Sequence, residues 1–188
     1  MKRGVNRLDA LGMIEVNSIA AGFGIADVMM KTADVRLVSA QPICCGKYMI
    51  IVQGGVSEVK SSVESGREMA GSSLVDSFVI ANIHPQVFKA LSCSTEMQGT
   101  NAIGVFETFS LAACIVTSDA AVKAADVDLL EIRLGRGMGG KSFVVMTGDV
   151  SAVKHAVEAG TKQQDLNGMI TNTVVIPSPH SDFIKAVL

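Results

Sequence analysis

Two short segments of the chain carry residue types that could do chemistry. The first is the run Ile43-Cys44-Cys45-Gly46-Lys47, in which two adjacent thiols precede a glycine. Thiolates bind soft metal ions and iron–sulfur clusters, and they take part in redox exchange. The other two cysteines, Cys93 and Cys114, stand alone in the sequence. Because no Cys-x-x-Cys spacing and no flanking histidine occurs, a single chain does not predict a four-thiolate zinc or cluster site.

The second segment is the glycine-rich loop Gly135–Ser142, which fits both G-x-x-x-x-G-K-S and G-x-G-x-x-G. Both phosphate-binding motifs require a helix directly after the loop, since its N-terminus holds the phosphates. Here Phe143–Thr147 follows, and its short apolar run predicts a strand. We therefore interpret the glycines as a tight turn and keep a nucleotide hydrolase only as an alternative hypothesis.

The remaining ionisable or nucleophilic residues predict structural roles. Glu15 and Glu107 lie in apolar strands, where buried carboxylates are paired or hydrogen-bonded, and we expect bonds to nearby backbone. His84 and His180 stand beside prolines at strand exits, which indicates turns. Lone thiols such as Cys93 and Cys114 are expected to be buried as small hydrophobic side chains. No arrangement of catalytic residues can be identified, so the sequence does not predict an enzyme.

The strongest pattern is an internal repeat. The segment Ala10–Glu15 recurs as Ala102–Glu107 at a spacing of 92 residues, and after a two-residue insertion Gly46-Lys47 recurs as Gly140-Lys141. Further matches in the same order are Ser18 with Ser110, Asp27 with Asp119, Lys31 with Lys123, Val35 with Val127, Leu37 with Leu129, and His84 with His180. We predict two copies of one domain, 9–96 and 100–188, joined by a short polar stretch.

Each copy has the pattern of a β-α-β-β-α-β unit, which predicts an α+β fold with helices covering one face of a sheet. Ser18 and Ser110 are expected to cap the first helix of each copy. The expected elements of the first copy are the strands Leu11–Val16, Val35–Ala40, Tyr48–Val52 and Leu74–Ile80, the helices Ile19–Lys31 and Ser57–Ala70, and a short terminal helix Pro85–Leu91. This order places the two thiols on the turn between the second and third strands.

Composition narrows the class of protein further. Hydrophobic residues make up 48% of the 188 residues, charged residues 18%, and the net charge is −2. No basic block predicts nucleic-acid binding, and the longest apolar run, Leu111–Val116, is far shorter than the roughly 20 residues of a membrane span. The chain opens with no secretion pattern, so we expect reduced thiols in a cytosol. Low charge predicts an assembly, and a duplicated domain lets a six-domain ring form from three chains.

The repeated pattern resembles the bacterial microcompartment shell domain. It is carried by Ala10-Leu-Gly-Met-Ile-Glu-Val16, by Met30-Lys-Thr-Ala-Asp-Val35, by the Gly-Lys turn, and by Ile176-Pro-Ser-Pro-His180. The strand-first order of both halves is similar to the unpermuted tandem type, whose members form homotrimers that mimic hexamers. The resemblance implies a flat shell facet inside the cytoplasm, tiled together with other shell proteins.

The resemblance also implies roles for particular residues. Lys31 and Lys123 match the lysine at the edge of neighbouring tiles. In tandem members with a similar cysteine turn, one cysteine from each of three chains holds a [4Fe–4S] cluster on the three-fold axis. Cys44 matches that ligand, and Cys45, which replaces a proline, is the alternative ligand. The turns implied to line the central pore comprise Ile43, Cys44, Cys45 and Gly46 of the first copy and Arg136, Gly137, Met138, Gly139 and Gly140 of the second.

Two functions follow as hypotheses. The first is a shell trimer whose cluster passes electrons across the shell, or is delivered to a redox enzyme of the lumen or the cytosol. The second is a shell trimer without a cofactor, whose central pore passes a small polar metabolite. The residues alone leave both open.

Overall fold

The computed structural model describes residues 10–95, 101–163 and 168–187. Its contacts divide the chain between Ile83 and His84 into two compact units. The ends of the predicted domains, residues 9, 96, 100 and 188, lie outside the described residues, as do most of the predicted polar junction and the N-terminal tail. The predicted boundaries 9–96 and 100–188 therefore stay predictions.

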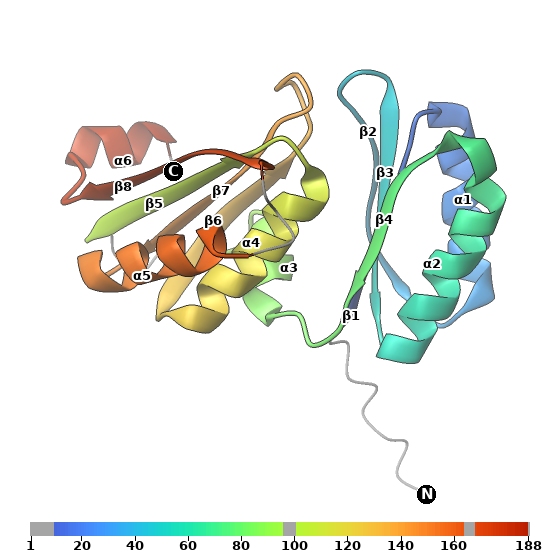
Figure 1. Cartoon of the computed structure of the whole chain (residues 1–188), viewed down its shortest axis with the longest axis horizontal. Helices are drawn as coiled ribbons and strands as arrows, with labels where there is room; N and C mark the ends of the chain where they lie inside the picture. The colour runs from blue at the N-terminus through green and yellow to red at the C-terminus, as the bar shows by residue number, and fades with distance from the viewer. Residues whose placement is uncertain (1–9, 96–100, 164–167, 188) are drawn as a thin grey trace, which may run out of the picture. The chain divides into compact units, whose positions relative to one another are not determined.

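The first unit is one antiparallel sheet with two helices on one face (Figure 1). Its strands lie in the order β2-β3-β1-β4, so the first strand is central and β2 is an edge. Its elements are β1 (Ala10–Val16), α1 (Ile19–Thr32), β2 (Arg36–Ile43), β3 (Lys47–Gly54), α2 (Val56–Ala70), the 3-10 turn η1 (Gly71–Ser73) and β4 (Leu74–Ile80).

The second unit repeats this arrangement in the strand order β6-β7-β5-β8. Its elements are α3 (Pro85–Leu91), β5 (Ala102–Thr108), α4 (Leu111–Ala124), β6 (Val127–Leu134), β7 (Ser142–Gly148), α5 (Val150–Thr161), β8 (Ile170–Pro177) and α6 (Ser181–Val187). The predicted tandem α+β fold is confirmed, and the expected elements form within a few residues of their predicted bounds.

The two units agree down to strand register. Ala10 pairs with Gly54 in the first unit as Ala102 pairs with Gly148 in the second. Both central strands shift register on the β4 or β8 side immediately after the glutamate, Glu15 or Glu107. The two-residue insertion inferred from the repeat therefore lies in the hairpin turn, because the paired strands on either side of it keep their partners.

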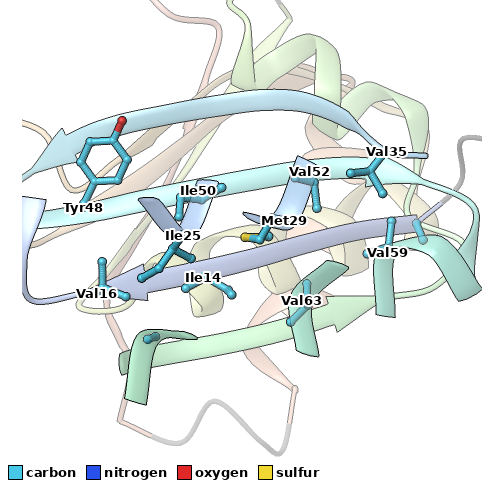
Figure 2. Packing of buried hydrophobic residues seen from close by; sticks show 12 residues of the cluster. Ile14, Val16, Ile25, Met29, Val35, Tyr48, Ile50, Val52, Val59 and Val63 are labelled. Carbon is cyan, nitrogen blue, oxygen red and sulfur yellow. The ribbon is translucent and has the colours of Figure 1, made fainter. Parts of the chain in front are cut away.

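The core of the first unit explains why its helices pack where they do. Ile25 and Met29 of α1 and Val59 of α2 point toward the strands, where Ile14 and Ile50 are fully buried (Figure 2). Apolar residues three to four positions apart on each helix form the stripe that faces the alternating apolar positions of the sheet. The expected caps also form: the Ser18 hydroxyl accepts from the Ala21 amide, and the Ser110 hydroxyl accepts from the Ala113 amide, each at 3.3 Å.

One expectation about layering is wrong for the second unit. Helices α4 and α5 cover one face of its sheet, but α6 lies on the opposite face (Figure 1). There Ile184 packs against a small cluster that includes Ile103, Leu130 and Val145. These side chains alternate with the positions that face α4 and α5, so both faces of this sheet carry apolar residues that need cover.

Candidate functional site

The two predicted thiols lie at the tip of the first hairpin. Strand β2 ends at Ile43 and β3 begins at Lys47, so Cys44, Cys45 and Gly46 form the turn. Gly46 adopts a φ of 76°, a left-handed backbone that glycine accepts without strain. The Cys44 side chain is half-buried and the Cys45 side chain is exposed. Adjacent residues thus present two thiols of different accessibility at one hairpin tip.

An ion pair anchors the base of this hairpin. Lys47 pairs with Glu15, whose side chain is only 5% exposed in the middle of the sheet. In the second unit, Lys141 Nζ lies 2.6 Å from Glu107 Oε1. Here Glu107 is 34% exposed, and the ammonium also lies 5.6 Å from the centroid of the Phe109 ring. Both glutamates are structural acids as predicted, but the expected backbone partner is wrong, because each carboxylate pairs with the lysine after the turn.

The second hairpin turn is longer and rich in glycine. Gly137, Gly139 and Gly140 all have positive φ, and the Lys141 amide donates to the Met138 carbonyl at 3.1 Å. Arg136 opens this turn. The Gly135 amide donates to the Lys141 carbonyl at 3.1 Å, so the ends of the turn meet as in an ordinary hairpin.

Strand β7 begins at Ser142, directly after this turn. A phosphate-binding loop would need a helix there to direct several amides at one anion. The predicted strand is confirmed, and the geometry of Gly135–Ser142 is that of a hairpin.

The other two cysteines differ from one another. Cys114 is fully buried on α4, and loss of hydration raises the pKa of its thiol to about 12. It is therefore an un-ionised hydrophobic side chain, as predicted. Cys93, in contrast, is exposed just after α3 in a left-handed conformation with a φ of 49°, so its predicted burial is wrong. The chain turns sharply there, which directs the side chain outward.

The histidines cap short helices. His84 Nδ1 accepts from the Gln86 amide at 3.4 Å, and His180 Nδ1 accepts from the Asp182 amide at 3.2 Å. Their predicted turn roles are confirmed, and the two copies use the same bond.

The two lysines at the ends of α1 and α4 form equivalent local pairs. Lys31 Nζ lies 2.6 Å from Asp27 and Lys123 Nζ lies 2.5 Å from Asp119. Asp27 is exposed, whereas Asp119 is largely buried and also accepts from the His84 amide at 2.8 Å. Both lysines remain at helix ends on the surface, where another molecule can reach them.

Within residues 10–95, 101–163 and 168–187, no three acidic, histidine or cysteine side chains gather closely enough to hold a metal ion. The donor chemistry of the first turn nevertheless suits an iron–sulfur cluster, because thiolates are its usual ligands and Cys44 and Cys45 lie at an accessible tip. A cluster at this turn therefore requires cysteines from more than one chain. Among the described helices, none has the length and apolar character to cross a bilayer.

Comparison with known proteins defines the family. A BMC domain is recognised at residues 10–83 and again at 102–179, so the chain belongs to the BMC-domain family and carries two copies of that domain. The predicted resemblance to tandem-type shell proteins of bacterial microcompartments is thereby confirmed.

Individual relatives cover nearly the whole chain. The bacterial microcompartment shell protein PduT of Citrobacter freundii is 40% identical over 95% of this chain and 97% of its own. The carboxysome assembly protein CcmO of Synechococcus elongatus is 30% identical over 95% of this chain and 68% of its own. A crystal structure of a microcompartment protein from Desulfitobacterium hafniense is 48% identical, covers 94% of this chain and 98% of its own, and superposes with a TM-score of 0.90.

Two features of the site were missed by sequence reasoning. The glutamate–lysine pairs were hidden because their partners lie about 30 residues apart in the sequence, although the repeat preserves both members. Gln86, which bonds to the edge of the second sheet, was also missed. Its twin in the repeat is Asp182, so similarity alone did not single it out.

Proposed function

We propose that this chain is a structural tile of a bacterial microcompartment shell, built as a homotrimer that places six domains around a central pore. The observation that supports this is the family match in both units together with their common strand order and register. Two matched domains in one chain can occupy adjacent positions of a ring that six single domains would otherwise fill. Other shell proteins are the expected neighbours in the facet, with Lys31 and Lys123 at the edges.

We further propose that the first hairpin turn holds an iron–sulfur cluster on the three-fold axis. Cys44 would supply one thiolate from each chain, and Cys45 is the alternative ligand. Ile43 and Gly46 would complete this wall of the pore, and the second turn, Arg136–Gly140, would form the rest. A [4Fe–4S] cluster, when bound, supplies one-electron chemistry, which serves transfer across the shell or exchange with a redox enzyme on either side.

The chain's own residues set how such a turn behaves. The Glu15–Lys47 pair ties the base of the hairpin to the central strand, so the thiols project from a supported end. The second turn contains Met138 and glycines but no thiol, so a fourth iron would take its ligand from water, a small thiol or another protein.

The alternative function is a cofactor-free pore for a small polar metabolite. The observation that favours it is the second hairpin turn, which is rich in glycine and contains no thiol that could bind iron. In this case Cys44 and Cys45 would remain thiols, and the glycine-rich turn would set the width of the pore. Both functions are structural rather than catalytic, in line with the shell proteins to which the chain is similar.

An anaerobic purification followed by iron and sulfide assays and EPR separates the two functions. For the cluster, we expect roughly four irons per three chains, because each chain supplies one thiolate to a shared [4Fe–4S] unit. Cys44→Ser should abolish the iron and Cys45→Ser should retain it. Loss with Cys45→Ser alone would move the ligand by one residue, and a trimer without iron in any preparation would leave the cofactor-free pore.

A further inference from the structure

Helix α3 packs against β6, the edge strand of the second sheet. Its Gln86 side chain accepts from the Leu129 amide of β6 at 2.8 Å and donates to the Asp128 carboxylate at 3.2 Å. Val87, the next residue of the helix, is fully buried, and so is Leu129. The edge strand β6 is thus covered by a helix that precedes the second sheet in the chain, which removes an exposed edge.

Helix α6, at the end of the chain, is the counterpart of α3 in the repeat, but it is not buried in the same way. His84-Pro-Gln-Val-Phe-Lys-Ala90 aligns with His180-Ser-Asp-Phe-Ile-Lys-Ala186, and both helices begin with the same histidine cap. In α6, however, Phe183 is 41% exposed where its twin Val87 is fully buried. Ile184 attaches α6 to its own sheet, but the Asp182, Phe183 and Lys185 side chains remain exposed.

In the first unit, the edge strand β2 corresponds to β6, and the surface around it is exposed to solvent. Leu37 of β2 is 41% exposed although its twin Leu129 is fully buried, and Phe23 of α1 is exposed although its twin Ile115 is buried. Asp27, the twin of the clamped Asp119, is also exposed. The residues to which His84 and Gln86 bond, Asp119, Asp128 and Leu129, therefore have counterparts on the first unit that are exposed to solvent: Asp27, Arg36 and Leu37.

The side chains of α6 and of the β2 edge are complementary in charge. Where the second unit has Asp128 on the edge strand, the first has Arg36, and where α3 carries Gln86, α6 carries Asp182. An amide–carboxylate bond within the chain would thus become an aspartate–arginine ion pair. Arg36 is exposed and forms no ion pair with any residue in the described part of the chain.

We propose that α6 of one chain docks on the β2 edge of a second copy, as α3 docks on β6. Asp182 would pair with the guanidinium of Arg36 and accept from the Leu37 amide, while the His180 amide would donate to Asp27. Phe183 would cover the apolar surface around Leu37. Because each chain offers one such helix and one such edge, the contact is head-to-tail and can close a ring of copies. This inference rests on the proposed trimer and assigns its interchain contact.

Charge exchange tests the pair directly. Arg36→Glu and Asp182→Arg should each raise the concentration at which trimers dissociate at least tenfold, because like charges would then face each other across the contact. The double variant should restore wild-type association. Lys154→Glu, an exposed reversal on α5, is the matched control and should change nothing. Sedimentation velocity over a concentration series measures the effect, and circular dichroism checks folding.

A disulfide trap keeps the test decisive if a charge variant misfolds. Arg36→Cys combined with Asp182→Cys should give covalent dimers and trimers on oxidation, whereas either single substitution gives only the background of the natural thiols. An intramolecular cross-link would overturn the proposal, as would wild-type trimers in both charge variants. If both charge variants form wild-type trimers, the proposed trimer remains but uses a different contact. If the wild-type chain is monomeric at every concentration, both the trimer and the α6–β2 contact are excluded.

Discussion

At the scale of single residues, the glutamate–lysine pairs connect the hairpin turns to the sheet. Their positions in the repeat could be predicted, because Glu15 recurs as Glu107 and Lys47 as Lys141. Their pairing could not, since it depends on the register that brings the start of β3 beside the end of β1. Burial then makes the two pairs unequal, and this difference also follows only from packing.

That inequality gives a prediction on stability. Lys47→Met should lower the free energy of unfolding by about 2–3 kcal/mol, because it leaves Glu15 almost buried and without its cation. The equivalent change Lys141→Met should cost under about 1 kcal/mol, since Glu107 is partly hydrated. Urea unfolding of both variants measures the difference. Equal losses would mean that burial does not distinguish the pairs.

Cys114 yields a prediction on alkaline stability. Its pKa is raised from 9.0 to about 12 by burial, so between these values the folded chain binds a proton that the unfolded chain has released. Stability conferred by the neutral thiol is complete below pH 9 and falls as pH rises toward 12. In Cys114→Ala, the free energy of unfolding should fall less steeply between pH 9 and 11 than in the wild type. Parallel slopes for the two proteins would contradict the assignment.

At the scale of elements, the repeat and the apolar periodicity predicted most of the fold. Both caps, the succession of strands and helices along each copy and the site of the insertion follow from local pattern. The placement of α6 on the opposite face of the second sheet could not be predicted, because α6 is too short for its apolar positions to indicate which face it covers. The exposure of Cys93 was missed for a related reason, since it depends on how the chain turns after α3.

Helix α1 offers a matched pair of glycines for testing its packing. At Gly22, an added Cβ would overlap the ring of Tyr48, whereas at Gly24 it would meet only the flexible end of Met69 at 3.0 Å. Gly22→Ala should therefore destabilise the chain by about 1–3 kcal/mol through overpacking. Gly24→Ala should be neutral or stabilise by up to about 1 kcal/mol through helix propensity. Thermal unfolding distinguishes them, and equal effects would contradict the close approach of α1 to β3.

At the scale of the whole molecule, two kinds of contact are proposed: one that closes the trimer and one that joins trimers into a facet. They use different residues. Arg36 and Asp182 belong to the first, Lys31 and Lys123 to the second. The sequence could suggest the lysines through family resemblance. The Arg36–Asp182 contact needed the structure, because only the packing of α3 on β6 indicates how α6 would pack on β2.

Facet assembly is therefore separable from trimer formation. Lys31→Ala combined with Lys123→Ala should raise the concentration needed for sheets at least tenfold, since edge contacts repeat across every tile, while the trimer mass stays unchanged. Lys162→Ala is a matched control, because Lys162 is also an exposed lysine at a helix end with an acid four residues before it. Electron microscopy reports the sheets and sedimentation reports the trimer. Sheets that persist in the double variant would exclude these lysines from the edge, and loss of the trimer would place them in the ring contact instead.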